Sequence, residues 1–244
     1  MAQEQTDTRQ PVAVVTGGTG SIGAAICSRF QSQNMRVVAA DLHVCPVPAG
    51  QAFFECNVTR SESLRDLLTY AAGLGPIHVI VAAHGILRET PAGSSDPEAV
   101  SATIDVNLKG LAYLFDLARS FMKAPGSIVA LSSWTAVGGR IRNAYAYQAT
   151  KAGLEMLVRN FAVAYGPDGI RVNCIAPGFM ADPMKGEGAE LRKRQGGMQG
   201  VIDGAPLRRL ILPQDIANAA AFLCSEEASA ITGIVLPDAG YRAL

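Results

Sequence analysis

Short apolar runs alternate with longer amphipathic stretches along the whole sequence. Several of the runs, such as Val12–Thr16 and Ile77–Ala82, are apolar at nearly every position instead of at every second one. Such continuous hydrophobicity is expected of strands that are covered on both faces. The pattern predicts strands at Val12–Thr16, Arg36–Asp41, Ala52–Cys56, Ile77–Ala82, Ser127–Ser132, Arg171–Ile175 and Ile234–Leu236.

The stretches between these strands carry apolar residues at helical spacing. They predict helices at Ser21–Gln33, Ser61–Ala72, Asp96–Phe121, Tyr145–Tyr165 and Pro213–Ser225. Strands that alternate with helices favour right-handed βαβ units. We therefore predict an α/β fold, namely a doubly wound parallel sheet of about seven strands with helices on both faces.

The domain organisation is expected to be simple. No internal repeat or Ser/Gly linker divides the 244 residues, so we expect one domain over residues 1–244. The stretch at about 180–205 departs from the alternation, because it is rich in glycine and basic residues and has no clear period. A loop of this length within a compact domain is usually functional. We expect it to be a lid.

The composition narrows the function class. Twenty-one Lys and Arg residues balance 21 Asp and Glu residues, whereas a protein that binds nucleic-acid phosphates usually has a strong basic excess. The N-terminus has neither the basic nor the apolar part of a signal peptide, and no apolar run reaches membrane-spanning length. The five cysteines and three histidines lack metal-site spacing. We expect a cytoplasmic protein with no metal, nucleic-acid partner or membrane contact.

A glycine-rich turn follows the first predicted strand directly and leads into a helix. Gly18, Gly20 and Gly23 fit the G-x-G-x-x-G pattern of dinucleotide-binding (Rossmann) folds. A side chain at these positions would block the tight turn or the approach of a pyrophosphate to the backbone. The helix N-terminus then offers free N–H groups to that anion. The pattern lacks the Gly-Lys-Ser/Thr of a mononucleotide-binding loop.

Asp41 ends the second predicted strand, 18 residues after Gly23. An acidic residue at this place hydrogen-bonds the adenine ribose hydroxyls of a dinucleotide. It would repel a 2′-phosphate, and Gly20 supplies no basic side chain to bind one. We therefore expect NAD to be preferred over NADP. The structural alternative is that Asp41 only closes a turn at the strand end.

Tyr147 and Lys151 lie four residues apart on a predicted helix and so share one face. A free phenol has a pKa of about 10, which is too high for efficient proton transfer near neutral pH. A neighbouring ammonium favours the phenolate and is expected to lower that pKa. This pair is a candidate acid/base site, although the same spacing also occurs by chance.

The context of this pair resembles the short-chain dehydrogenase/reductase family. Ser133 directly follows the predicted strand Ser127–Ser132, fourteen residues before Tyr147, and Asn107 lies in an Asp-Val-Asn-Leu-Lys-Gly stretch. The resemblance runs from Val12 to Tyr241. The matching motifs, in chain order, are Thr16–Gly23, Asn107, Ser133, Tyr147/Lys151, Arg171–Gly178 and Pro206–Arg209.

The resemblance implies a catalytic tetrad of Asn107, Ser133, Tyr147 and Lys151. Tyr147 would be the general acid/base, and Ser133 would hydrogen-bond the substrate oxygen. Lys151 would bind the nicotinamide ribose, and Asn107 would hold a relay water. The cofactor-binding set would be Gly17, Thr19, Gly20, Ser21, Ile22, Asp41, Asn57, Val58, Ala83, Gly85, Tyr147, Lys151, Pro177, Gly178 and Met180. Members of the family are commonly tetramers or dimers, so a homo-oligomer is also implied.

The chain departs from the family's pattern at several cofactor positions. Ser21 stands where the second glycine is usual, and Asn57 replaces an Asp near the adenine. His84 lies within Ala82-Ala83-His84-Gly85, where the family has Asn-Asn-Ala-Gly. His84 is either a cofactor contact or a structural histidine. Asp182 replaces a Thr that commonly binds the nicotinamide amide.

The substrate is expected to be a small molecule. Candidate contacts are Ser133, Trp134, Tyr145, Tyr147 and Met184, a largely apolar set that suits a hydrophobic or aromatic secondary alcohol and its ketone. The favoured interpretation is an NAD-dependent oxidoreductase for such an alcohol. One alternative is a 3-oxoacyl thioester reductase of the acyl-carrier-protein type. Another is a non-catalytic NAD-binding regulatory protein, although mere binding would not need a proton donor.

Overall fold

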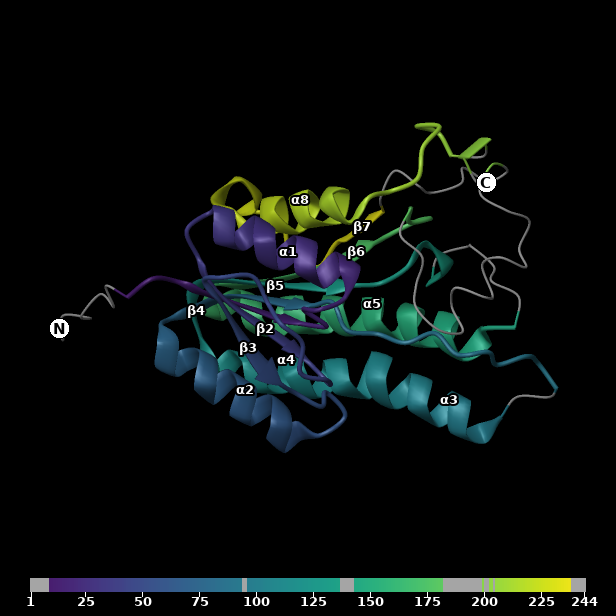
Figure 1. Ribbon diagram of the computed structural model, residues 1–244, viewed down its shortest axis with the longest axis horizontal. Coiled ribbons are helices and arrows are strands. Elements are labelled where there is room, and N and C mark those ends of the chain that lie inside the picture. The colour runs from purple at the N-terminus through teal and green to yellow at the C-terminus, as the bar shows by residue number, and fades with distance from the viewer. Residues whose placement is uncertain are drawn as a thin grey trace.

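The computed structural model describes residues 9–93, 96–136, 143–181, 199, 202–203 and 205–237. These residues form a seven-stranded sheet in which every neighbouring pair of strands is parallel, in the order β3-β2-β1-β4-β5-β6-β7 (Figure 1). The doubly wound α/β fold predicted from the hydrophobic pattern is confirmed. The strands are β1 (Val12–Thr16), β2 (Arg36–Asp41), β3 (Gln51–Glu55), β4 (Ile77–Ala82), β5 (Met122–Leu131), β6 (Ile170–Ala176) and β7 (Val235–Pro237).

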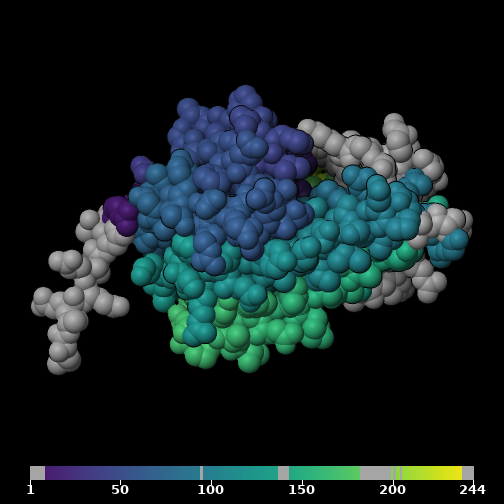
Figure 2. Space-filling view, turned by 90° about the horizontal axis from the view of Figure 1, so that it is seen from below, coloured from purple at the N-terminus to yellow at the C-terminus, as the bar shows by residue number. Residues whose placement is uncertain are grey.

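Helices cover both faces of the sheet. On one face lie α1 (Ser21–Ser32) and α8 (Pro213–Cys224), which pack against each other (Figure 1). The other face carries α2 (Ser61–Leu74), α4 (Gly110–Phe121) and α5 (Tyr145–Tyr165). Seen from that side, these helices lie side by side, and α3 (Pro97–Ile104) continues the layer (Figure 2).

The side chains of β1 show why its sequence is apolar at every position. Val12 and Val14 pack into the core under α2, α4 and α5, whereas Ala13 and Val15 pack into the core under α1 and α8. All four are fully buried. Burial of a valine side chain stabilises a fold by about 1.5–3 kcal/mol, so a polar residue at any of the three valines would be costly.

The predicted helix Asp96–Phe121 is wrong in one respect, because the helical segment is interrupted in its middle. It consists of α3, a π-helical turn at Asp105–Lys109, and α4. Asp96 caps α3 as expected, since its carboxylate accepts a hydrogen bond from the amide of Glu98. The π-helical turn has no signal in the hydrophobic pattern, and it carries a residue of the candidate site.

The strand order reverses between β1 and β4, which is where an open parallel sheet of this kind forms a crevice at the carboxyl ends of its strands. The candidate site residues come from segments that follow those ends. None of the described helices combines the length and the apolar character needed to cross a membrane.

Candidate active site

The turn between β1 and α1 has no room for side chains at three glycines, Gly17, Gly18 and Gly23. Gly17 has a φ of +69°, a left-handed conformation that favours glycine. Gly23, in the first turn of α1, lies so close to Gly17 that a Cβ there would be 2.0 Å from the Gly17 carbonyl oxygen. Because these positions are glycines, the chain can form a tight loop that lies close to the N-terminus of α1.

The N-terminus of α1 is suited to an anion. Gly20 precedes the helix in an extended conformation, and no side chain caps the helix start. The amides of Ser21 and Ile22 are among those that an α-helix leaves without an internal partner. Free amides and the positive end of the helix dipole attract phosphate groups. The residues present therefore fit the pyrophosphate of a dinucleotide.

Asp41 lies at the end of β2, and its carboxylate is occupied by the turn. Its Oδ2 accepts hydrogen bonds from the amide of Thr19 at 3.2 Å and from the Thr19 hydroxyl at 2.5 Å. Its Oδ1 accepts a bond from the amide of Leu42 at 2.8 Å. A carboxylate has about four acceptor sites, so these three bonds leave capacity for about one more donor.

Other predicted cofactor residues follow the ends of β3 and β4. The amide oxygen of Asn57 accepts bonds from the backbone and the hydroxyl of Thr59, and the side chain of Val58 packs on the core beside Gly110. The amide of Ala83 donates to the carbonyl of Thr16 at 2.9 Å, which holds the segment after β4 against the phosphate-binding turn.

Ser133 and Tyr147 approach each other from different elements. Ser133 follows β5, Tyr147 lies in the first turn of α5, and their side chains hydrogen-bond each other. Both side chains are buried, with exposed fractions of 6% and 8%. The Ser133 hydroxyl also accepts a bond from the Thr135 hydroxyl at 3.0 Å, which orients it. The predicted Ser133–Tyr147 pair is thus brought together by the fold.

Lys151 lies one turn of α5 after Tyr147, with its Nζ 5.7 Å from the centre of the Tyr147 ring. Its ammonium donates to the carbonyl oxygen of Leu131 at 2.6 Å. Burial lowers the pKa of Lys151 to about 8. The lysine therefore loses part of its positive charge just above neutral pH.

The expected lowering of the Tyr147 pKa by Lys151 is wrong for this structure. Burial raises the pKa of Tyr147, and the hydrogen bond from Ser133 is what opposes the rise. The physical reason is that a buried phenol loses the solvation that stabilises its anion. The lysine ammonium, which the spacing placed beside the phenol, is directed instead at the Leu131 carbonyl.

Asn107 lies in the π-helical turn and is almost completely buried. Its amide exchanges two hydrogen bonds of 2.8 Å with the backbone N–H and C=O of Ile86, and it donates to the Thr150 hydroxyl at 3.3 Å. Asn107 thus joins the segment after β4 to α5. A Cβ at Gly85 would lie 3.4 Å from Asn107 Oδ1 and 3.5 Å from Lys151 Nζ, so both groups converge on this glycine.

The segment after β6 lies against Trp134, which follows Ser133. The carbonyl of Pro177 accepts a bond from the amide of Trp134, and the Trp134 ring packs on Phe179 with centroids 4.8 Å apart. Gly178 and Met180 flank that phenylalanine and are partly buried. Tyr145 is 44% exposed at the start of α5. Phe179 was not among the predicted site residues, although its position after Gly178 was a usable signal.

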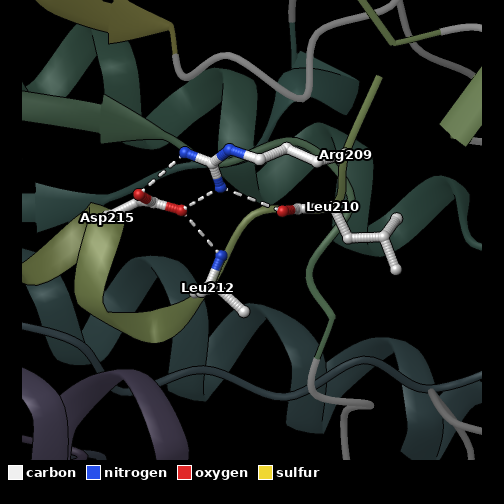
Figure 3. A network of polar contacts seen from close by, with 4 residues as sticks. All are labelled: Arg209, Leu210, Leu212 and Asp215. Atoms are coloured by element: carbon white, nitrogen blue, oxygen red, sulfur yellow. Dashed lines mark hydrogen bonds and ion pairs between the residues drawn. The ribbon is translucent and has the colours of Figure 1, made fainter. Parts of the chain in front are cut away.

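A hydrogen-bonded network fixes the start of α8 near the same segment (Figure 3). Asp215 forms two bonds with the Arg209 guanidinium, at 2.6 and 2.9 Å, and accepts a third from the amide of Leu212. Next to it, Ile211 exchanges backbone bonds with Phe179 and Ala181. The chain before α8 is therefore tied to the segment that packs on Trp134. Met184, Asp182 and most of the predicted lid lie outside the described residues.

A buried acid behind the site was also missed by sequence reasoning. Glu155 lies one turn after Lys151 on the buried face of α5, and its Oε1 accepts a bond from the Ser132 hydroxyl at 2.8 Å. Ser132 adjoins Ser133, so this bond ties the end of β5 to the helix that carries Tyr147. The signal in the sequence was an acid four residues after Lys151, on the apolar side of the helix.

Comparison with known proteins gives matches over nearly the whole chain. Residues 17–242 match a family profile described as Enoyl-(Acyl carrier protein) reductase. Cis-4-hydroxycyclohexanecarboxylate dehydrogenase of Sinomonas cyclohexanicum is 34% identical, over 96% of this chain and 97% of its own length. Acetoacetyl-CoA reductase of Synechocystis is 35% identical, over 92% of this chain and 93% of its own.

A solved structure is also similar to this protein over nearly the whole chain. Thermoplasma acidophilum aldohexose dehydrogenase in its ligand-free form has a TM-score of 0.85 and 30% sequence identity. The similarity covers 96% of this chain and 94% of that one.

Proposed function

Since the chain belongs to the short-chain dehydrogenase/reductase family, whose members are oxidoreductases that bind a nicotinamide cofactor, we propose that it is an NAD-dependent enzyme. Its reaction is the interconversion of a hydrophobic or aromatic secondary alcohol and its ketone. The observation that carries the proposal is the buried Ser133–Tyr147 hydrogen bond at the carboxyl ends of the parallel strands. A protein that only binds a dinucleotide has no need for a proton donor at that place.

Each residue of the site has a separate role in the reaction. The bound nicotinamide supplies the hydride for reduction or accepts it in oxidation. Tyr147 donates its phenolic proton to the substrate oxygen during reduction and takes it back during oxidation. Ser133 donates a hydrogen bond to the same oxygen and orients it. Because burial disfavours the Tyr147 phenolate, the neutral phenol, which is the form that donates a proton in reduction, is the favoured form of Tyr147.

Lys151 and Asn107 support this proton transfer. Lys151 binds the nicotinamide ribose and keeps a cationic group one helical turn from the phenol. The Asn107 side chain is already bonded to Ile86 and Thr150, so a relay water would be held by a backbone group of the π-helical turn. The role of the Asn107 amide is to keep that turn open beside Lys151.

The preference for NAD rests on Asp41. A 2′-phosphate beside this carboxylate would bring two negative charges together, whereas ribose hydroxyls can donate to it. Thr19 already uses Oδ2, so binding of both ribose hydroxyls requires the Thr19 side chain to rotate away. The remaining contacts with the cofactor are proposed for Gly17, Gly20, Ser21, Ile22, Asn57, Val58, Ala83, Gly85, Pro177, Gly178 and Met180.

The substrate class rests on the Trp134–Phe179 pair. Two packed aromatic rings beside Ser133 favour an apolar ring or chain over a highly hydroxylated substrate. The 34% identical relative is named for a hydroxycyclohexane carboxylate, an alicyclic secondary alcohol. We further propose a cytoplasmic, homo-oligomeric enzyme with one catalytic domain and a lid at about 180–205.

One steady-state experiment tests cofactor and substrate together. The purified enzyme is assayed by NADH absorbance with cyclic and aromatic secondary alcohols, their ketones and acetoacetyl thioesters, with NAD(H) and NADP(H) in parallel. We expect the highest kcat/KM for an apolar cyclic or aromatic pair with NAD(H). The Asp41→Asn variant, which keeps size and removes charge, should reduce the discrimination against NADP(H). A wild-type preference for NADP(H) would refute the assignment of Asp41.

A second candidate is reduction of a 3-oxoacyl thioester, which the 35% identical acetoacetyl-CoA reductase favours. The same panel separates the two proposals. A kcat/KM for acetoacetyl thioesters well above that for every cyclic or aromatic ketone would replace the first proposal with the second.

A further inference from the structure

His84 occupies a central place that the proposed mechanism leaves without a role. It follows β4, between Ala83 and Gly85, and its backbone packs directly against the phosphate-binding turn. A Cβ at Gly17 would lie 2.6 Å from the His84 amide nitrogen. His84 is thus in contact with the turn proposed to bind the pyrophosphate.

The imidazole of His84 reaches two further elements. Its Nδ1 lies 2.7 Å from the hydroxyl oxygen of Thr16, the last residue of β1. The ring also hydrogen-bonds the backbone of Val106 in the π-helical turn, next to Asn107. That bond favours the protonated ring, so it is a ring N–H that donates to the Val106 carbonyl.

These two bonds determine the tautomer of the ring. The Thr16 hydroxyl has one proton, and its other neighbour, the carbonyl of Val81, is 3.5 Å away. Because a neutral imidazole has a single N–H and the Val106 carbonyl accepts it, Nδ1 is the bare nitrogen, so the Thr16 hydroxyl donates to Nδ1 of His84. Nε2 then carries the ring proton and donates to Val106. This assignment uses every donor and acceptor of a neutral imidazole.

The surroundings keep the ring neutral. Burial and the nearby Lys151 ammonium lower the pKa of His84 to about 3, although Asp41 and the Val106 carbonyl act in the opposite direction. Beside Val106 in the π-helical turn, Asp105 is paired with Lys109 at the surface. A neutral ring adds no second positive charge beside Lys151.

We propose that His84 is a positioning residue which, as a neutral imidazole protonated on Nε2, joins the end of β1 to the π-helical turn and so holds Asn107 in register with the phosphate-binding turn. The role in turnover rests on the proposed oxidoreductase function. The hydrogen-bonding role is a property of the cofactor-free protein.

A pair of substitutions separates bonding from packing. His84→Gln retains one donor and one acceptor, whereas His84→Leu has similar bulk and neither. We expect His84→Leu to lower kcat by about ten-fold to a hundred-fold and to weaken NADH binding, because small misplacements of catalytic groups are costly. His84→Gln should stay within about five-fold of wild type for both quantities. Equal effects of the two variants would reduce His84 to a space-filling residue and overturn the proposal.

The Thr16 hydroxyl gives an independent test of the same bond. Thr16→Val removes the donor and Thr16→Ser keeps it, so only the first should lower kcat. In the double variant Thr16→Val/His84→Leu the losses should not add, since both remove one interaction. His78→Gln is the matched control, because His78 also bonds a backbone carbonyl, that of Pro125, but at the amino end of β4. It should leave kcat unchanged.

Nitrogen-15 NMR of the cofactor-free protein provides a readout that does not depend on turnover. With His43→Gln and His78→Gln variants for assignment, the His84 ring should show a protonated Nε2 and a bare Nδ1 from pH 8 down to pH 5. A protonated Nδ1, or titration near pH 6.5, would overturn the proposal. If the NMR result holds but no substrate is turned over, the proposed function fails and the structural role of His84 stands.

Discussion

Gly23→Ala is a severe test of the phosphate-binding turn, because helix propensity predicts a gain in stability and steric overlap predicts a loss. Gly23 lies in α1, where replacing glycine with alanine ordinarily stabilises a helix by about 1 kcal/mol. Here the new Cβ would lie 2.0 Å from the backbone oxygen of Gly17, whereas real Cβ contacts essentially never fall below 3.0 Å. The start of α1 or the turn must therefore move by about 1 Å.

The size of the stability loss depends on which part of the protein has to move to make room for the new methyl group. Overpacking a tight site usually costs about 1–3 kcal/mol and sometimes more, and here the obstacle is backbone that cannot rotate away. After the propensity gain is subtracted, we expect a net loss of about 2 kcal/mol. For a chain of this size, that corresponds to a fall in Tm of about 4–8 °C. NADH affinity should fall by at least about ten-fold, because the amides no longer converge on one point.

Thermal unfolding and NADH fluorescence titration measure both effects. Gly73→Ala is the matched control, since Gly73 lies in α2 and the methyl group that alanine adds there would have nothing within 4 Å. That variant should keep wild-type NADH affinity and a Tm at or above that of wild type. If Gly23→Ala binds NADH like wild type and does not lose stability, the tight-turn account is refuted.

Three further outcomes are expected. Tyr147→Phe should lower kcat by about 10²–10⁴-fold with little change in NADH affinity, because only the proton path is lost. Retained turnover in this variant would show that another group is the acid/base. A wild-type protein with no turnover on any substrate would favour a regulatory NAD-binding protein. Ser132→Ala should remove the donor to buried Glu155 and lower the free energy of unfolding by about 2 kcal/mol, seen as a lower urea midpoint. Ser132→Thr should retain most of the stability. Equal urea midpoints for Ser132→Ala and wild type would mean that this bond is not stabilising. Burial raises the pKa of the Cys27 and Cys174 thiols to about 12, so at pH 8 only about one in 10⁴ of each is the reactive thiolate. A thiol reagent should label exposed Cys45 quickly and leave these two buried thiols unmodified until urea unfolds the chain; rapid labelling of Cys27 or Cys174 in the native protein, located by peptide mapping, would contradict their buried placement.

Much of the fold followed from the sequence because the relevant patterns are local. Continuous apolar runs identified the strands within one or two residues, except that β5 begins at Met122 instead of Ser127. The glycine spacing located the turn before α1, since only residues without a Cβ fit there. The four-residue spacing also placed Tyr147 and Lys151 on one side of α5.

The interactions of the site side chains depended on segments far away in the sequence. The π-helical turn around Asn107 is held by Ile86 and Thr150, so hydrophobic periodicity alone predicted an unbroken helix. Lys151 donates to the carbonyl of Leu131, and burial raises the pKa of Tyr147, contrary to the effect expected from spacing.

The sequence by itself determined the order of strands and helices and the residue types available at the carboxyl edge of the sheet. Only the tertiary structure decided the state of those residues, as His84 and Glu155 show. Each hydrogen-bonds a residue at least 23 positions away along the chain. The physical reason is that backbone conformation responds to neighbours in sequence, whereas protonation and side-chain orientation respond to the dielectric and the hydrogen-bonding groups that folding brings close.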